Sequence, residues 1–473
     1  MTAFSLTLRF DHFDSLKRHL LRDDGHERAA YILCNKVRID NDPWDRQAHE
    51  KFLTAKILPV PDEDIIDSTP TRVTWRTRSF AQALKSAQIN NALVAIVHNH
   101  PSGMTEFSSQ DDENEPDLLQ MAKNRNGPDT KIISLLLTQD EQLAGRVWLH
   151  PSPSGFMPLK TIRVFGSRIN LHYPDRFKNM NLPAFNRQAL AFGAALNQDF
   201  RQLRVGIVGC GGTGSAVATL LGRLGVGQIA LFDKDIVDET NLNRLHGARQ
   251  ADADAMLPKV TVVARSITEI GLGVRTIPVH AWIGDRICRD ALKSCDVVFG
   301  CTDDHDGRLF LNRFAYYYLT PVIDIGLAID VGKGLIPEII ALDGRVTVLG
   351  QGHTCLVCRE IINPQIAASE ALKRQNPTEY EKRKAEAYVF GEGNPRPAVV
   401  TFTTELACMA VNELIHRLQG FRGTDGDSIN RVRKFHLNLD RLPGHSPRAG
   451  CTLCSGDDIL GKGDVEPFMG RID

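Results

Sequence analysis

The stretch RVGIVGCGGTGSAVATLLGRL, residues 204–224, decides the fold of the second half of this chain. Its first five residues are mostly apolar and branched, which predicts a short buried strand. A turn of glycines follows, and Ser215 begins a helical pattern that continues to about Leu224. Glycines between a strand and a helix let a phosphate approach the free amides at the helix N-terminus. The stretch therefore predicts a nucleotide site that includes Gly209, Gly211, Gly212 and Gly214.

The residues around this stretch alternate between strand and helix patterns. Apolar segments at 228–232, 296–300 and 321–325 predict further strands with helices between them. This alternation implies a buried, mostly parallel sheet of the Rossmann-like α/β class. Asp233 ends a strand about twenty residues after the glycine turn, where a carboxylate suits ribose hydroxyls. Residues 360–397 are polar and charged, and they predict a solvated helical insert or a mobile loop.

Composition sets bounds on the whole chain. Its 473 residues exceed one ordinary core, so two or three domains are expected. The formal net charge of -1 gives no sign of a nucleic-acid or membrane partner. The N-terminus carries acidic residues and does not resemble a signal peptide, and no apolar run of about eighteen residues is present. We therefore expect a cytoplasmic protein.

Four of the ten cysteines stand in two CxxC pairs, Cys355 with Cys358 and Cys451 with Cys454. Two such pairs have the spacing of a structural zinc site made of four thiolates. Ten cysteines are too few for a disulfide scaffold in a chain of this length, and metal-bound thiolates fit a reducing cytoplasm. The pairs therefore predict a structural zinc in the C-terminal half.

A second metal signature lies in the N-terminal half, which shows mixed helix and strand patterns. His98 and His100 follow an apolar strand, and alternate side chains of extended backbone share a face, so both imidazoles reach one metal. Asp111 supplies a third ligand and leaves the fourth position of a zinc ion open for water, as in catalytic sites. Ser108 offers a hydroxyl to steady an oxyanion. Hydrolysis also needs a carboxylate that carries the proton of the water to the leaving group.

The turn-rich residues 151–155 mark the expected exit from this N-terminal domain. We accordingly expect a first domain over 1–155, a basic, irregular linker over 156–180, and a second domain over 181–473 that contains the insert.

The histidine segment resembles the JAMM (JAB/MPN) metalloprotease family, and HNHPSG is also similar to the RadC branch of that fold. The family pattern is an upstream Glu, then HxH, seven residues, Ser, two residues and Asp, and the chain matches it at His98, His100, Ser108 and Asp111. Glu27 matches the upstream Glu. The resemblance covers about 1–150 and implies a catalytic zinc and cleavage of peptide or isopeptide bonds after the tail of ubiquitin-like proteins. A turn stabilised by two His and one Asp is the alternative.

Polar residues around the glycine turn distinguish two kinds of nucleotide enzyme. A dehydrogenase fits the turn and Asp233 equally well, but it needs no set of cations around its pyrophosphate. Adenylation needs Arg and Lys to neutralise the reacting phosphates, and a carboxylate to hold magnesium. The chain carries such a set of polar residues in Arg187, Asn241, Arg244, Lys259 and Asp303.

This set resembles that of the ThiF/MoeB and ubiquitin-activating-enzyme family, over about residues 181–473. The resemblance implies ribose at Asp233, the triphosphate of ATP at Asn241, Arg244 and Lys259, and magnesium at Asp303. It also implies a homodimer in which Arg187 reaches the site of the neighbouring subunit, and it assigns the two CxxC pairs to the family's zinc site.

The two resemblances together predict an α/β fusion of a JAB/MPN-type metallopeptidase domain with a ThiF-type adenylation domain. The second half would adenylate the C-terminal glycine of a ubiquitin-like protein, and the first half would trim or remove that modifier, with a conjugating enzyme as a further partner. Two rivals stay open: activation of a sulfur-carrier β-grasp protein for cofactor biosynthesis, and a modifier-binding scaffold with an inactive peptidase domain.

The cysteines leave the fate of the activated acyl group open. The insert contains no cysteine, and Cys408 lies in an apolar helical pattern that is typical of a core. Direct transfer from the acyl-adenylate, or an oxyester on Ser or Thr, is therefore an alternative to a cysteine thioester.

Overall fold

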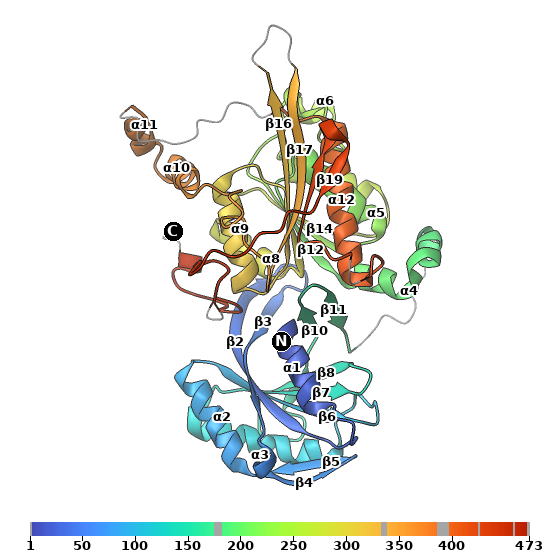
Figure 1. Ribbon diagram of the computed structural model, residues 1–473, viewed down its shortest axis with the longest axis vertical. Helices are drawn as coiled ribbons and strands as arrows, with labels where there is room; N and C mark the ends of the chain where they lie inside the picture. The colour runs from blue at the N-terminus through green and yellow to red at the C-terminus, as the bar shows by residue number, and fades with distance from the viewer. Residues whose placement is uncertain are drawn as a thin grey trace. The chain divides into compact units, whose positions relative to one another are not determined.

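The computed structural model describes residues 2–174, 182–332, 338–385, 397–423, 426–456 and 459–470. The chain forms two units. The first unit comprises Met1–Phe177, Tyr317–Leu319 and Leu460–Gly470, and the second comprises the remainder. Each unit contains its own large sheet (Figure 1).

The sheet of the first unit has nine strands among the described residues, in the order β11-β10-β1-β3-β2-β6-β7-β8-β9. These strands are β1 (Ala3–Arg9), β2 (Ala29–Asp42), β3 (Gln47–Pro59), β6 (Leu93–His100), β7 (Ile132–Thr138), β8 (Leu143–Trp148), β9 (Phe156–Pro158), β10 (Thr161–Phe165) and β11 (Ile169–His172). Strands β4 (Ile65–Thr69) and β5 (Arg72–Trp75) pair separately. Helix α1 (Phe10–Leu20) packs on one face, and α2 (Thr77–Ile89) and α3 (Ser109–Asn126) pack on the other (Figure 1).

Alternating side chains explain why the central strands are buried on both faces. On β2, Ala30 and Ile32 belong to the core cluster that includes α1, whereas Tyr31 and Leu33 belong to the cluster that includes α2 and α3. A strand buried on both faces needs a continuous apolar run rather than an alternating one. This is why the apolar segment before His98 predicts β6 correctly.

The range 156–180, which the sequence predicts to be a linker, lies in its described part mostly within the sheet. Strands β9, β10 and β11 occupy it, and β10 pairs in parallel with β1. Ile162 and Val164 of β10 are buried in the core. The basic residues of this range mask the strands, because Arg163 is itself buried and interrupts the apolar pattern. The first unit therefore extends past residue 155, and 175–181 lie outside the described residues.

The two ends of this sheet meet. Only two residues, Leu159 and Lys160, separate β9 at one end of the strand order from β10 near the other. The Leu159 N–H donates to the Gly145 carbonyl at 2.9 Å, and the Lys160 N–H donates to the Phe4 carbonyl at 2.8 Å. Because two residues span less than about 10 Å, the sheet must curl around its core.

The sheet of the second unit has the strand order β14-β13-β12-β15-β16-β17-β18-β19. Its strands are β12 (Arg204–Val208), β13 (Gln228–Phe232), β14 (Arg275–Val279), β15 (Val297–Gly300), β16 (Val322–Val331), β17 (Ile339–Leu349), β18 (Asn430–Lys434) and β19 (Leu439–Arg441). The pairs from β14 to β16 are parallel, and those from β16 to β19 are antiparallel. The predicted Rossmann-like parallel sheet is thus confirmed, with an antiparallel extension.

The winding of this sheet reverses at β12. The chain runs outward from β12 through β13 to β14 and then returns to the other side of β12 for β15 and β16. At such a reversal the loops that follow the two central strands diverge and leave a crevice at their carboxyl ends. Here those loops are 209–211 after β12 and 301–304 after β15.

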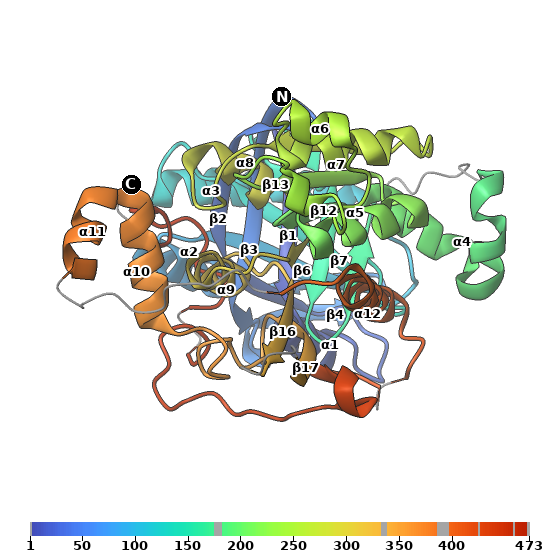
Figure 2. The same cartoon turned by 90° about the horizontal axis from the view of Figure 1, so that it is seen from above.

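The helices of the second unit are α4 (Asn186–Gln202), α5 (Gly212–Leu224), α6 (Gln250–Asp254), α7 (Lys259–Glu269), α8 (Arg289–Lys293), α9 (His305–Tyr317), α10 (Pro364–Gln375), α11 (Pro377–Ala385) and α12 (Val400–Gln419). The predicted insert contains α10 and α11, and its residues 386–396 lie outside the described residues. Both views place α10 and α11 on the side of this unit opposite α4 (Figures 1 and 2). None of the described helices has the length and apolar character that a bilayer crossing requires.

Candidate functional sites

A cavity of about 410 Å³ lies at the crevice of the second unit. It is lined by most of the residues that the sequence predicts to bind a nucleotide: Gly209, Gly211, Gly212, Asp233, Arg244, Lys259 and Asp303. These seven residues, up to about ninety-five positions apart in sequence, thus supply the cavity with glycine amides, two of its cations and two of its carboxylates.

The glycines of the turn differ in whether the structure leaves room for a side chain. Gly209 has φ +89°, and a Cβ there would lie 2.8 Å from the backbone carbon of Cys301. A Cβ on Gly214 would lie 1.8 Å from the Gly209 carbonyl oxygen, so Gly214 lets α5 pack against the turn, but it does not line the cavity. At Gly211 a Cβ would meet nothing within 4 Å, which leaves that side of the turn open. Two glycines therefore shape the loop, and a third faces free space.

Asp233 is fixed by backbone amides at the end of β13. Its carboxylate accepts the N–H of Cys210 at 2.6 Å and the N–H of Asp235 at 2.8 Å. Burial raises the pKa of this carboxyl despite these bonds and the nearby Lys259. The carboxylate is therefore held rigidly between the glycine turn and the loop after β13.

The two cations that the sequence predicts for this cavity enter from different elements. Lys259 begins α7, and its Nζ lies 3.1 Å from the Asp235 carboxylate. Arg244 follows a short 3-10 turn and donates to the Thr240 carbonyl. Its side chain lies beside Gly212, where a Cβ would meet it at 3.4 Å. Both positive charges thus border the wall that contains the glycine turn.

The loop after β15 supplies two aspartates. Asp303 is exposed and lines the cavity. Asp304 also lines it and is bound by neighbours, because it accepts the Thr302 hydroxyl and, at 3.4 Å, the Trp282 indole N–H. The pair gives the cavity carboxylate oxygens of the kind that magnesium prefers.

Besides Gly214, two predicted polar residues do not line this cavity. Asn241 is buried and donates to Asp238 at 3.2 Å, so in this structure it holds the turn that carries Arg244. Arg187 is exposed on α4 and does not line the cavity of its own chain. Sequence reasoning in turn missed Trp282, which lines the cavity from the segment after β14.

The histidine site of the first unit has the spacing of a metal centre. His98 Nε2 lies 3.2 Å from His100 Nε2 and 3.5 Å from Asp111 Oδ1. Ligand atoms of the three residues all lie within 4.8 Å of one another. Bonds of about 2.1 Å in a tetrahedral zinc site place neighbouring ligand atoms about 3.4 Å apart, which these distances match.

Neighbouring groups orient two of these three side chains, His100 and Asp111. His100 Nδ1 donates to the Met104 carbonyl at 3.0 Å, which leaves the lone pair of Nε2 directed at the site. The Ser108 hydroxyl donates to Asp111 Oδ2 at 2.7 Å and caps α3. In this structure Ser108 therefore positions the carboxylate rather than facing an open oxyanion position.

Glu27 lies beside this group. It is buried, its charge interacts with His98 and Asp111, and burial raises its pKa to about 7. Asn99 fixes the backbone next to it, because its Oδ1 accepts the Arg28 N–H at 2.6 Å and its Nδ2 donates to the His26 carbonyl at 3.2 Å. A carboxyl with a pKa near neutrality, beside side chains with the spacing of metal ligands, has the properties of a general base.

A buried ion pair supports the start of α3. Arg146 of β8 donates to Glu115 at 2.8 Å and to Asp112 at 2.5 Å. Its guanidinium carbon lies 3.9 Å from the centre of the Phe107 ring. Arg146 thus holds residues on both sides of Ser108 and Asp111, and sequence reasoning missed it because it lies more than thirty residues downstream of them.

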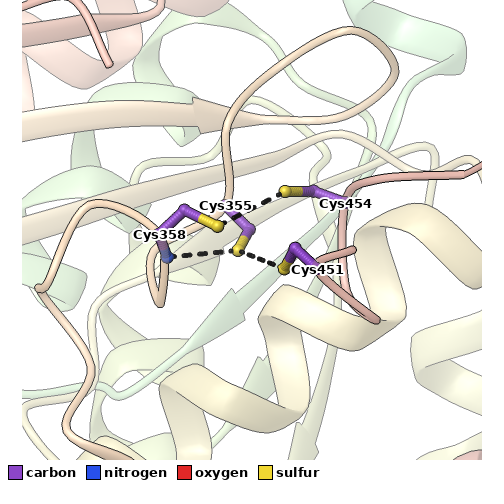
Figure 3. A group of neighbouring side chains, drawn as sticks. All are labelled: Cys355, Cys358, Cys451 and Cys454. Carbon is purple, nitrogen blue, oxygen red and sulfur yellow. Dashed lines mark hydrogen bonds between the residues drawn. The ribbon is translucent and has the colours of Figure 1, made fainter. Parts of the chain in front are cut away.

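The four predicted thiolates come together in two facing turns (Figure 3). Cys355 Sγ lies 3.9 Å from Cys451 Sγ, and Cys358 Sγ lies 3.9 Å from Cys454 Sγ. Zinc–sulfur bonds of about 2.3 Å place tetrahedral sulfurs about 3.8 Å apart, so the four atoms fit one ion. The hydrogen bond from the Cys454 thiol and the backbone amide of Cys358 both lower the pKa of Cys355, which favours a thiolate.

Comparison with known proteins matches each half of the chain to a protein family model. The model of the ThiF family matches residues 185–453, more than half of the chain. The chain belongs to the ThiF family. A model described as prokaryotic homologs of the JAB domain matches residues 10–148. The chain therefore joins an N-terminal JAB-like domain to a C-terminal ThiF domain.

The chain is similar to named adenylation proteins over about a third of its length. It is 31% identical over 180 residues to molybdopterin-synthase adenylyltransferase of Escherichia coli (37% of this chain and 66% of that protein) and 34% identical over 194 residues to ubiquitin-like modifier-activating enzyme 5 of Caenorhabditis briggsae (37% and 41%). It thus spans less than two thirds of the length of these relatives. Escherichia coli MccB is a solved structure with a TM-score of 0.45 and 16% identity, over 60% of this chain and 75% of MccB.

The pKa of Glu27 predicts how stability depends on pH in metal-free protein. The folded pKa of about 7 exceeds the ordinary 4.5, so the folded state resists ionisation, and the stability conferred by protonated Glu27 is lost as pH rises from 4.5 through 7. Glu27→Gln cannot ionise, so it should gain stability relative to the native chain by about 3 kcal/mol between pH 4 and pH 8. Urea unfolding with a chelator present measures this gain. The exposed Glu113→Gln should show none, and a flat difference for Glu27→Gln would contradict the raised pKa.

Proposed function

We propose that the second unit uses ATP to adenylate the C-terminal carboxylate of a ubiquitin-like or sulfur-carrier β-grasp protein. The observation that carries this proposal is the cavity in which Arg244, Lys259 and Asp303 surround the glycine turn. The names of the relatives, one acting for molybdopterin synthase and the other on a ubiquitin-like modifier, support the substrate class.

The reaction needs charge stabilisation more than acid–base chemistry. The carboxylate oxygen of the modifier attacks the α-phosphorus of ATP, the bond to the bridging oxygen breaks, and pyrophosphate leaves with the electron pair. Lys259 and Arg244 would neutralise the charge that develops on the phosphates, and Asp233 would hold the ribose. Asp303, next to Asp304, fits a magnesium ion, which when bound would offset the charge of the phosphates.

We propose that Arg187 completes the site of a neighbouring subunit in a homodimer. Its exposed position on α4, away from the cavity of its own chain, supports this role. The exposed fraction of 88% at Leu190, one helical turn further along α4, also supports a contact surface there.

Removing a charge that stabilises the transition state should slow adenylation. We expect Arg187→Ala and Asp303→Ala each to lower modifier-dependent exchange of labelled pyrophosphate into ATP by about two to three decades. Arg223→Ala, on an exposed part of α5, is the matched control and should keep native exchange.

A mixed dimer separates action within a chain from action across chains. If Arg187 acts on the neighbour, a dimer of one Arg187→Ala chain and one Asp303→Ala chain contains one site with both native groups and recovers exchange. No recovery, with dimerisation confirmed, would contradict the proposed action across the dimer.

The acyl group would leave the adenylate without resting on a cysteine of the cavity. Cys301 lines the cavity, but burial raises its pKa well above the ordinary range of a thiol. Because the thiolate is the nucleophile, such a cysteine reacts poorly at neutral pH. We propose that the acyl group passes directly to an external acceptor, such as the thiol of a conjugating enzyme.

We propose that the first unit hydrolyses the bond after the modifier's tail at a zinc held by His98, His100 and Asp111. When bound, the zinc would lower the pKa of a water molecule toward about 7 and polarise the scissile carbonyl. Glu27 would take the proton of the water that attacks the carbonyl carbon, and would deliver it to the amine as the carbon–nitrogen bond breaks. Its pKa of about 7 supports this exchange at neutral pH.

Substitutions should separate metal binding from proton transfer. We expect Glu27→Ala to abolish cleavage of a modifier with an extended tail and to retain zinc, because Glu27 moves a proton and binds no metal. His100→Ala should lose both. Cleavage is followed by mass spectrometry and zinc by elemental analysis, with Glu113→Ala on the exposed face of α3 as control. Normal cleavage by Glu27→Ala would assign the base to another carboxylate.

We also propose that the four cysteines hold a structural zinc. Cys451→Ser should then lower the zinc content by one ion per chain and lower the melting temperature with it, because metal binding contributes to folding. Cys408→Ser, in α12 and outside this group, should change neither. An unchanged zinc content in Cys451→Ser would refute the site.

A further inference from the structure

Helix α10 of the insert contacts a wall of the nucleotide cavity. The guanidinium carbon of Arg374 lies 3.4 Å from the centre of the Trp282 ring. Trp282 lines the cavity and is 8% exposed. The Arg374 guanidinium therefore stacks on the indole, at a distance at which cation–π attraction is strong.

The same helix is bonded to the start of α9, directly after the loop that carries Asp303. The Arg374 Nη1 lies 2.8 Å from Asp306 Oδ2. Glu370, one turn earlier on α10, accepts the Asp306 N–H at 2.8 Å. The N–H of Asn363, just before α10, donates to His305 Nδ1 at 3.1 Å. Three contacts thus attach α10 to a single turn of the chain beside the cavity.

Arg374 lies against several carboxyl groups at this junction. The side chains of Asp304, Asp306 and Glu370 lie close enough for their charges to interact, and burial and these neighbours raise the pKa of Glu370. The exposed Asp303 precedes them in sequence. Arg374 is a cation that the structure places against this acidic group, next to a cavity that would receive a triphosphate.

We propose that α10 is an integral part of the nucleotide site, in which Arg374 is a positioning residue that holds Trp282 as a wall of the cavity and offsets the acidic start of α9. This inference rests on the proposed binding of ATP. Holding the indole in place before ATP arrives lowers the ordering cost of binding. Offsetting the carboxylates lowers their repulsion of the phosphates.

Two substitutions of one side chain test the role of Arg374. We expect Arg374→Ala to weaken ATP binding about tenfold, because it removes both the stacking and the charge. Arg374→Lys keeps a charge for Asp306 but lacks the planar guanidinium, so it should weaken binding about threefold. Arg383→Ala is the matched control, since Arg383 lies on α11 and pairs with Glu379 at an exposed position. Binding is measured by calorimetry without the modifier.

Tryptophan emission reports on the position of the indole. Three of the four tryptophans, Trp44, Trp75 and Trp148, belong to the first unit, so subtracting the spectrum of Trp282→Phe isolates the signal of Trp282. We expect ATP to change this signal in the native chain and in Arg383→Ala. In both Arg374 variants the signal should already differ before ATP is added.

The outcomes separate this inference from the proposed function. If the native chain binds ATP and either Arg374→Ala or Arg374→Lys binds it with the same affinity, the role of Arg374 is overturned but the proposed function is not. An unchanged Trp282 signal in both variants would also overturn it. Absence of ATP binding in the native chain would overturn the proposed function, and this inference with it. If Arg374→Ala melts at a lower temperature, Arg374→Lys, which keeps the side-chain stem and charge, supplies the decisive comparison.

Discussion

The parallel pairing of β12 with β15 is the constraint on which the nucleotide cavity depends. The register aligns Val208 with Gly300, so both strands end at the same level. The next residues, Gly209 and Cys301, then lie so close that a Cβ on Gly209 would meet the Cys301 backbone at 2.8 Å. This contact brings the glycine turn against the loop with Asp303 before the two loops diverge. A larger residue at position 209 would separate the amides of one loop from the carboxylates of the other.

In the first unit, the register between β2 and β6 places Glu27 beside the histidine group. Antiparallel pairing of β2 with β6 aligns Ala29 with His98, and the Asn99 side chain continues this pairing to the backbone of Arg28. Asn99 lies between the two histidines and points to the opposite side of the strand, because side chains alternate along extended backbone. Asn99, which is not one of the three clustered side chains, therefore determines where Glu27 lies relative to His98 and Asp111.

Sequence patterns predicted the features that depend on short stretches of chain. The glycine turn, the HxH pair with Asp111, and the cysteine pairs are local because each is set by the spacing of a few residues. The strands of 156–172 were not predictable in this way, because β10 is a core strand only through its pairing with β1, more than 150 residues away. The placement of Asn241 depends similarly on packing, since it lies near the predicted triphosphate site in sequence but bonds to Asp238.

The first unit also contains a buried network of Ser5, His49 and Asp42, whose geometry resembles a catalytic site but which has almost no exposure to solvent. Ser5 Oγ lies 2.9 Å from His49 Nε2, and His49 Nδ1 lies 3.1 Å from Asp42 Oδ2, which is the arrangement of a nucleophile, a base and an orienting acid. All three residues are at most 2% exposed, so no substrate reaches the hydroxyl. Burial lowers the pKa of His49, and the network satisfies polar atoms inside the core.

The histidine group differs from this network in its opening to solvent. The Asp111 side chain is 20% exposed, and the neighbouring Ser108 is exposed at the start of α3. Burial raises the pKa of Glu27 toward neutrality, while the partly exposed Asp111 opens the helix side of the group to solvent. Catalysis by a carboxyl group needs both conditions, because burial shifts its pKa into a useful range and exposure of its neighbours lets the substrate approach. The exposure of Asp111 is compatible with the role proposed for Glu27, whereas the burial of the network at Ser5 assigns that network a structural role.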